Sequence, residues 1–325
     1  MSESIPVKIH ESAKAKFLLD GMKESLLKRQ IDPKFHYINL QQAQDWLFLH
    51  RKYSPYATSE KVKKIYADAF QWMAIELAGS QTHLTSIASG DARKEAQLLK
   101  ELQKTVVVVT ATLSDISRPL VCQGYRLLIS EKCVSRADAV VLDFLKAPNV
   151  AKLLFKRNQR HVKNLVTSFG LMPNTDPLLM VSKLHSFAKK SIVLVGTNLA
   201  NPNNIKEVLA GYDNTETRRW LFQFFHNCGF DRADGEFVFS IEPCPSMPQL
   251  PQVVARFNLH RNKTILFDGN MFHFKASESI KAFFSNRYDE MLLKNLFKMN
   301  GFQILGEWIS DDKTEGVIAC SVTSP

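Results

Sequence analysis

Three apolar runs of the sequence are each followed by residues whose side chains could hold a nucleoside. The first run leads into Gly90, the second into Asp115, and the third into Asp143 and Phe144. Glycine lets a ligand approach the backbone, and the free N–H groups of a following helix attract an anion. The carboxylate of Asp115 comes 25 residues after Gly90, where it could accept both hydroxyl protons of a ribose. The Asp143 carboxylate beside the Phe144 ring would suit an amino group on a stacked base.

Each of these positions also has a purely structural interpretation. Gly90 could be ordinary turn chemistry between a strand and a helix, since no second glycine completes a GxGxxG motif. Asp115 could cap the next helix, and Asp143 could be a cap ahead of a core phenylalanine. Three such positions at three successive strand ends favour a binding site more than any one of them does.

The pattern of apolar runs predicts the elements that must position these residues. Short β-branched runs alternate with amphipathic segments long enough for a helix, which is typical of strands buried on both faces and joined by helical crossovers. The expected strands are His83–Ala88, Thr105–Thr112, Ala137–Leu142, Asn164–Phe169 and Ser191–Gly196. The sequence therefore predicts an α/β fold with a doubly wound, Rossmann-like parallel sheet, in which ligands bind at the carboxyl ends of the strands.

The segments on either side of this alternation follow a different pattern. Residues 1–80 favour helices, and a further helix is expected at Thr215–Cys228. An alternating strand is expected at Val253–His260, with the prolines of 243–251 interrupting regular structure before it. A turn signal at 268–270 predicts a hairpin, and a helix and two strands close the chain. These segments predict a second, mixed α+β lobe.

The composition limits the class of protein. The chain has 325 residues, 45% hydrophobic and 23% charged, which is typical of a soluble globular protein too large for a single small core. No run approaches the roughly 18 apolar residues of a membrane span, and the N-terminus lacks a hydrophobic signal core. The five cysteines are scattered and form no CxxC pair, so neither a disulfide framework nor a metal site is expected. We expect a cytoplasmic protein without a membrane partner.

The net charge of +10 permits nucleic-acid binding without establishing it. No zinc finger and no aromatic RNA-binding signature accompanies the basic residues. We therefore do not expect a nucleic acid to be the main partner.

From residue 53 onward the chain carries an ordered set of short motifs. They are ASGDARKE at 88–95, SDIS at 114–117, LDF at 142–144, LVTSFGLMPN at 165–174, VGTNL at 195–199, GYDN at 211–214 and SNRY at 285–288. This order resembles the histidine-specific S-adenosylmethionine-dependent methyltransferases. That family includes the ergothioneine-pathway histidine Nα-methyltransferase and the dimethylallyltryptophan N-methyltransferase. The resemblance implies a Rossmann-like methyltransferase fold and S-adenosyl-L-methionine as the cofactor.

The resemblance also implies roles for individual residues on the cofactor side. Gly90 and Lys94 would lie against the methionine end of the cofactor. Asp115 would hold its ribose, and Asp143 with Phe144 would hold its adenine.

On the substrate side, the resemblance implies that Asn174 and Tyr212 grip the amino and carboxylate groups of an amino-acid substrate. Gly170 would lie nearby, and Tyr53 or Tyr56 matches the tyrosine that closes the pocket. Asn174 and Tyr212 are thus the candidate catalytic residues. Without the resemblance, Asn174 would be interpreted as a helix cap and Tyr212 as a turn residue.

One departure from the family pattern concerns the substrate's side chain. The family reads approximately GExIxxExSxKY where this chain has SESIKAFFSNRY at 277–288. Phe283 thus replaces the glutamate that reads the imidazole ring, while Ser285 remains. A phenylalanine cannot accept a hydrogen bond from an imidazole N–H, and leaving that donor unpaired costs about 1–3 kcal/mol. An apolar or aromatic side chain is therefore predicted in place of histidine.

We predict an enzyme that transfers methyl groups from S-adenosylmethionine to the α-amine of an amino acid or an amino-acid-derived small molecule. Its cofactor domain would comprise residues 59–198 and 286–325, and a substrate-covering lobe would comprise residues 1–58 and 199–285. Two alternatives stay open on the sequence. One is transfer of the cofactor's aminocarboxypropyl arm in place of a methyl group, and the other is a cofactor- or RNA-binding relative without turnover.

Overall fold

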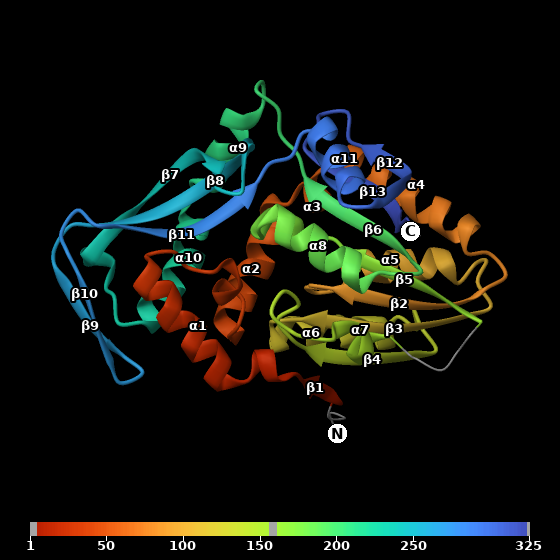
Figure 1. The fold of residues 1–325 in the computed structure, drawn as a ribbon, viewed down its shortest axis with the longest axis horizontal. Coiled ribbons are helices and arrows are strands. Elements are labelled where there is room, and N and C mark those ends of the chain that lie inside the picture. The colour runs from red at the N-terminus through yellow and green to blue at the C-terminus, as the bar shows by residue number, and fades with distance from the viewer. Residues whose placement is uncertain (1–4, 156–160, 324–325) are drawn as a thin grey trace.

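The dominant feature of the computed structural model, which describes residues 5–155 and 161–323, is an 8-stranded sheet in the order β1-β4-β3-β2-β5-β6-β13-β12 (Figure 1). Its strands are β1 (Val7–Ile9), β2 (Gln81–Ile87), β3 (Val108–Asp115), β4 (Arg136–Val141), β5 (Val162–Ser168), β6 (Ser191–Asn198), β12 (Phe302–Ile309) and β13 (Glu315–Val322). Strands β1 to β6 pair in parallel, and β13 and β12 add an antiparallel edge. The strand order reverses between β2 and β5, which makes that point the ligand site of a doubly wound sheet.

Helices cover both faces of this large sheet. On one face lie α4 (Glu60–Glu76), α5 (Arg93–Leu102) and α6 (Arg118–Ser130), and on the other lie α7 (Val150–Leu154), α8 (Pro177–Phe187) and α11 (Glu290–Met299). Each face has its own apolar core, with Leu84 and Leu113 in the first and Val166 and Val195 in the second. Strands buried on both sides explain the continuous apolar runs of the sequence. The predicted α/β, doubly wound fold is confirmed.

A second sheet, antiparallel and in the order β11-β8-β7, lies beyond the carboxyl ends of the large sheet (Figure 1). This small-sheet half consists of α1 (Ala15–Lys28), α2 (Leu40–Tyr53), α9 (Ile205–Tyr212), α10 (Thr215–Asn227), β7 (Gly235–Cys244), β8 (Met247–Leu259), β11 (Ser279–Asn286) and the hairpin of β9 (Lys263–Phe267) and β10 (Asn270–Phe274). A third apolar core, which includes Phe224, Phe225 and Phe257, holds these elements together.

The expectation that prolines interrupt regular structure at 243–251 is wrong. β7 and β8 continue through Pro243 and Pro251, which pair with each other, and the chain turns after Cys244. β7 tolerates a proline because it is an edge strand, where no neighbour needs its N–H group. β8 consequently begins at Met247 and not at Val253. The sequence pattern also does not predict β7, β11 or α9.

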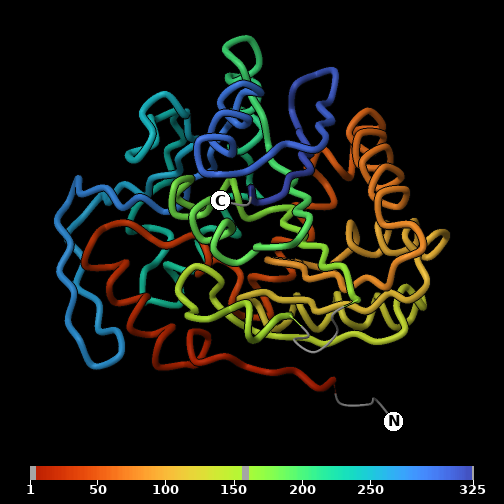
Figure 2. Tube along the Cα trace, turned by 45° about the vertical axis from the view of Figure 1, so that its right-hand side comes forward, coloured from red at the N-terminus to blue at the C-terminus, as the bar shows by residue number. Residues whose placement is uncertain are grey.

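The N-terminal segment differs from the predicted division of the chain. Val7–Ile9 pairs in parallel with Ala139–Val141 of β4 and forms an edge of the large sheet, although the prediction places residues 1–58 in the substrate-covering lobe. A strand of three residues carries too little periodicity to be recognised in the sequence. Figure 2 shows this segment running along the sheet edge before it enters α1.

Within the described ranges, no helix combines the length and the apolar character that crossing a bilayer requires.

Candidate active site

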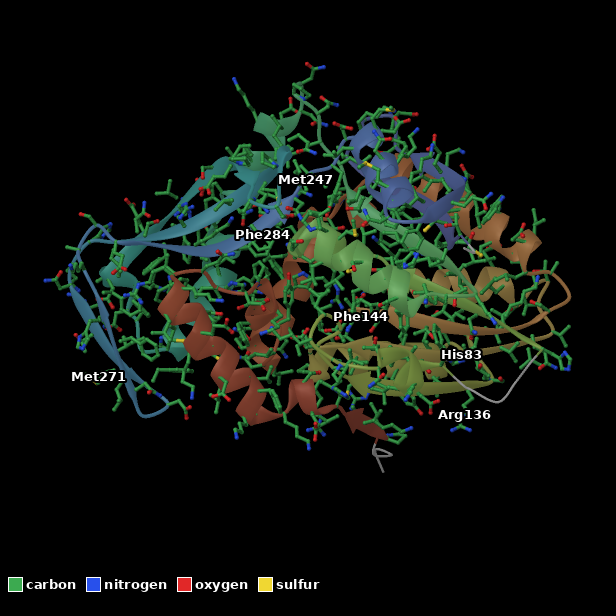
Figure 3. The ribbon with its side chains drawn as sticks, in the orientation of Figure 1. His83, Arg136, Phe144, Met247, Met271 and Phe284 are labelled. Atoms are coloured by element: carbon green, nitrogen blue, oxygen red, sulfur yellow. The ribbon has the colours of Figure 1, made fainter. Side chains whose placement is uncertain are left out.

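A cavity of about 600 Å³ lies where the strand ends of the large sheet meet the small-sheet half. Loops after β2, β3, β4 and β5 form one wall, and α2, α9, α10 and β11 form the other. In Figure 3, Arg136 at the start of β4 lies at the outer edge of the molecule, whereas Phe144 beyond the end of β4 lies near its centre. All of the site residues predicted from the sequence line this cavity: Tyr53, Tyr56, Gly90, Lys94, Asp115, Asp143, Phe144, Gly170, Asn174, Tyr212, Phe283 and Ser285.

The Asp115 carboxylate lies at the end of β3 and is bound to the loop after β2. Its Oδ2 accepts a hydrogen bond from the Gly90 N–H at 2.9 Å, and its Oδ1 accepts one from the Ser117 N–H at 2.8 Å. The N-cap of α6 is Ser117, so the interpretation of Asp115 as the helix cap is wrong. Burial raises the pKa of Asp115 to about 6. Each carboxylate oxygen retains capacity to accept a further hydrogen bond from a ligand.

The loop after β2, residues 88–91, lines the cavity and is called the cradle below. Gly90 adopts a φ of +54°, and a Cβ at this position would come within 3.1 Å of the Trp46 ring. Both the left-handed backbone and the close approach therefore favour glycine. The neighbouring Ser89 hydroxyl is buried and has no hydrogen-bond partner among the described residues. An unpaired hydroxyl in a cavity wall leaves a place for a polar group of a ligand.

The Asp143 carboxylate holds both its own turn and a lysine of the small-sheet half. Its Oδ1 accepts from the N–H groups of Leu145 and Lys146, and its Oδ2 pairs with Lys34 Nζ at 2.8 Å. Burial alone would lower the pKa of Lys34, but the carboxylates of Asp143 and Asp32 raise it above its usual value. Asp143 therefore caps the backbone N–H groups that follow it, as its structural interpretation predicts, and it also lines the cavity.

The Phe144 ring is buried beside this turn. It packs edge-on against Phe187 of α8, with 5.5 Å between the ring centroids, and it also lines the cavity.

Lys94 belongs to a buried polar cluster at one end of the cavity. Its Nζ donates to the Tyr66 hydroxyl at 2.7 Å and pairs with Glu315 Oε1 at 3.3 Å. Glu315 Oε2 in turn accepts from Asn198 Nδ2 at 2.9 Å. Burial raises the pKa of the adjacent cavity residue Glu95 to about 7. Glu315 is not among the residues predicted from the sequence. It lies at the start of the antiparallel strand β13, whereas the prediction considers only residues at the carboxyl ends of parallel strands.

Aromatic side chains form the wall on the small-sheet side. Phe283 lies 5.4 Å from Trp220 and 6.3 Å from Tyr212 between ring centroids. Tyr37 packs against Trp220 and Trp46, and all of these residues line the cavity. The sequence analysis does not identify Tyr37, Trp46 and Trp220, which follow no strand. The aromatic-rich composition of residues 35–56 is an available signal for Tyr37 and Trp46 only.

The Phe283 ring itself offers no acceptor to an imidazole N–H. His36 packs behind it at 6.2 Å between ring centroids, and burial lowers the pKa of His36 to about 4, so that it is neutral at pH 7. Its Nε2 is already paired with the Ala282 carbonyl at 2.8 Å. The rings that pack against Phe283, those of Trp220, Tyr212 and His36, therefore carry no charge at pH 7.

A set of polar groups lies beside the aromatic wall. The Tyr212 hydroxyl donates to Ser285 Oγ at 3.2 Å and accepts from Arg287 Nη2. Asn174 Nδ2 donates to the Phe284 carbonyl at 2.8 Å, which fixes the orientation of its amide. The sequence reasoning missed Arg287, since no pattern in the sequence distinguishes a buried arginine from an exposed one.

The two tyrosines proposed to close the pocket differ in their surroundings. Tyr53 is 40% exposed, and its hydroxyl donates to Glu216 at 3.1 Å. Tyr56 is buried, and its hydroxyl donates to Gln97. Gly170 lines the cavity, and a Cβ added at this position would have no heavy atom within 4 Å.

The sequence profile of a family described as histidine-specific, S-adenosylmethionine-dependent methyltransferases matches residues 53–322. The chain belongs to this family. It is therefore an S-adenosylmethionine-dependent methyltransferase, as the resemblance of its motifs predicts, and S-adenosylmethionine is its cofactor.

Solved methyltransferase structures are similar to the chain at low identity. The CcbJ methyltransferase from Streptomyces caelestis is 11% identical over 80% of this chain and 89% of that one, with a TM-score of 0.38. The magnesium protoporphyrin IX methyltransferase ChlM from Synechocystis PCC 6803, with bound SAH, is 10% identical over 96% and 100%, with a TM-score of 0.42. RosA from Streptomyces davawensis, a riboflavin-derivative dimethyltransferase, is 11% identical over 96% and 71%, with a TM-score of 0.39. No curated protein sequence matches the chain. The family profile alone carries the assignment.

Proposed function

We propose that this methyltransferase methylates the α-amine of an amino acid, or of an amino-acid-derived small molecule, whose side chain is apolar or aromatic. The observation that carries the proposal is the cavity wall of Phe283, Trp220 and Tyr212, in which an aromatic ring stands where the family has the glutamate that accepts from the imidazole N–H. Aromatic pairs gain about 0.5–1.5 kcal/mol beyond their buried area, so such a wall selects an aromatic ligand.

The strand-end residues fit the cofactor. S-adenosylmethionine supplies a methyl group that is already activated on its sulfonium. Asp115 would accept the ribose hydroxyls, Asp143 and Phe144 would hold the adenine, and the cradle at Gly90 with Lys94 would hold the methionine end. The buried and unpaired Ser89 hydroxyl in this cradle supports the fit, because a ligand is needed to complete it.

The residues around Asn174 and Tyr212 would orient the substrate amine. Because Asn174 Nδ2 is held by the Phe284 carbonyl, its Oδ1 stays available to accept a hydrogen bond from the amine. Fixing a reactant in this way can supply several kcal/mol of the barrier. The amine proton would be lost to solvent before the methyl transfer, and the Tyr212 hydroxyl, which Arg287 and Ser285 hold in place, would accept a hydrogen bond from the neutral amine. Asp213 is not a candidate acceptor, because Arg218 binds its carboxylate at 2.7 Å and it does not line the cavity.

An amino-acid library tests the substrate class directly. The protein is saturated with S-adenosylhomocysteine, and the unfolding temperature is measured with each amino acid in turn. We expect tryptophan, phenylalanine and related apolar amino acids to raise the unfolding temperature, because a ligand at a hundredfold its Kd stabilises the folded state by about 2.7 kcal/mol. Histidine should produce no comparable shift. A library in which histidine gives the largest shift, or in which no amino acid gives any, would contradict the proposal.

A further inference from the structure

Arg287 is a buried cation whose charge is not balanced. It is 4% exposed and follows directly after β11, where its N–H donates to the Pro251 carbonyl at 2.8 Å. Arg287 lines the cavity, and one guanidinium nitrogen, Nη2, donates to the Tyr212 hydroxyl. The other two nitrogens, Nε and Nη1, are buried with no hydrogen-bond partner in the part of the chain that the structure describes. An arginine has five N–H donors, so most of its capacity is unused.

The other lysines and arginines that line the cavity differ from Arg287 in having carboxylate partners, whereas Lys281 of β11, which does not line it, donates to the Gln252 amide oxygen at 2.9 Å. Lys34 pairs with Asp143 at 2.8 Å, and Lys94 pairs with Glu315 at 3.3 Å. Arg256, on the neighbouring strand of the small sheet, makes two bonds of 2.7 and 2.8 Å to Glu242. Across residues 5–155 and 161–323, no carboxylate lies within 4.0 Å of Arg287.

A buried charge without a counter-charge is destabilising, and natural proteins rarely retain one. A guanidinium is always protonated, so Arg287 cannot relieve this cost by losing a proton. A group that enters the cavity must therefore supply the negative charge. The planar guanidinium matches the planar carboxylate in geometry, and pairs of this kind are among the stronger hydrogen bonds in proteins.

We propose that Arg287 binds the α-carboxylate of the substrate and makes that carboxylate a requirement for binding. This inference rests on the proposed function and narrows its substrate class to amino acids with a free carboxylate, excluding their amides and the corresponding amines. The position of Arg287 favours the substrate over the cofactor as the source of the carboxylate. It follows a strand of the small sheet beside Tyr212, Ser285 and Phe283, whereas the cofactor residues Asp115 and Asp143 follow strands of the large sheet.

The first experiment compares ligands on the wild-type protein. With the protein saturated with S-adenosylhomocysteine, calorimetry measures the affinities of L-tryptophan, tryptamine and indole-3-propionate. Tryptamine lacks the carboxylate, and indole-3-propionate lacks the amine. We expect both carboxylates to bind on the order of tenfold to a hundredfold more tightly than tryptamine, as is usual for hydrogen bonds to a charged group. Equal binding of tryptamine, or no binding by either carboxylate, would overturn the inference.

The second experiment removes the charge. In Arg287→Met the preference for carboxylates should disappear, and in Arg287→Lys it should be partly retained. The matched control is Arg256→Met, which removes a paired arginine outside the cavity and should leave the preference unchanged. A preference that survives in Arg287→Met would overturn the inference.

Two further readouts separate the proposed role from other roles of Arg287. The affinity for S-adenosylhomocysteine should be the same in Arg287→Met and in the wild type, and a loss equal to that of tryptophan would assign the arginine to the cofactor's carboxylate. The unfolding temperature of the ligand-free variant should stay level or rise, because an unpaired buried charge has been removed. A fall of several degrees would assign Arg287 to the stability of the fold instead.

Because indole-3-propionate cannot be N-methylated, its binding tests Arg287 even if the proposed methylation of an amine is wrong.

Discussion

At the scale of single residues, the proposed cofactor site depends most on Asp115. Its two carboxylate oxygens are already held by the Gly90 and Ser117 N–H groups, so the side chain is fixed before a ligand arrives. We expect Asp115→Asn to weaken S-adenosylhomocysteine binding on the order of tenfold to a hundredfold, because one acceptor becomes a donor facing ribose hydroxyls. Calorimetry measures the loss, and circular dichroism checks that the fold is retained. Unchanged affinity in the folded variant would remove the ribose assignment.

The pKa of Asp115 also predicts a pH dependence. Burial raises this pKa to about 6, so the free protein carries a proton on Asp115 below that pH. If the ionised carboxylate accepts the ribose hydroxyls, the proton must be lost on binding, and affinity for S-adenosylhomocysteine should be level above pH 6 and fall below it. Asp115→Asn should abolish this step. Glu95→Gln should retain it, because burial places the pKa of Glu95 higher, at about 7.

The residue types at the strand ends could be predicted from the sequence, whereas their surroundings could not. Gly90, Asp115 and Asp143 follow apolar runs whose length and composition indicate parallel strands, and parallel strands bring their carboxyl ends together. The pairing of Asp143 with Lys34 joins residues that are 109 positions apart, and no local pattern encodes it. The sequence likewise does not show that Arg287 Nε and Nη1 lack a partner among the described residues, because this depends on which side chains the fold places beside them.

At the scale of elements, β11 delivers the substrate side of the cavity. After an irregularity between Lys281 and Phe283, alternate positions along this strand and just beyond it, Phe283, Ser285 and Arg287, line the cavity, as the period of two in a β-strand requires. The intervening Asn286 points elsewhere and donates to the Thr175 carbonyl at 2.7 Å. One strand thus supplies an aromatic ring, a hydroxyl and a charge to the same wall.

A substitution on β11 tests its part in substrate selection. Phe283→Glu should raise the affinity for histidine on the order of tenfold, because the new carboxylate can accept the imidazole N–H. The affinity for tryptophan should fall in the same variant. Phe284→Glu is the matched control, since Phe284 is buried next to it but does not line the cavity. Calorimetry with S-adenosylhomocysteine present measures both ligands, and a folded Phe283→Glu variant that ignores histidine would show that the substrate side is wrongly aligned.

The sequence pattern could not predict β11 because both of its faces are buried. Seven of its residues, from Ile280 to Asn286, have little exposed surface, so apolar and polar positions do not alternate as they would on a half-exposed strand. β7 was not predicted for a different reason: it contains a proline, which argues against a strand unless the strand lies at a sheet edge, as β7 does. The parallel strands were predictable because helices alternate with them along the chain.

At the scale of the whole molecule, the cavity lies between two structural halves. We propose that residues 59–198 and 286–325 hold the cofactor, and that the small-sheet half covers the substrate, with Val7–Ile9 as an exception in the large sheet. The ion pair of Lys34 with Asp143 joins the two halves beside the proposed adenine site. An arrangement of this kind lets the cofactor and the substrate approach each other from opposite walls while side chains exclude water.

The most direct test of the central claim is the mass of the product. The purified protein is incubated with S-adenosylmethionine labelled in its methyl group and with the amino acids that raise its unfolding temperature, and the products are fragmented in a mass spectrometer. We predict that one or more labelled methyl groups appear on the α-nitrogen of an apolar or aromatic amino acid. An unlabelled addition with the mass of the aminocarboxypropyl arm, a label on any other atom, or no product from a protein that binds S-adenosylhomocysteine would contradict the account.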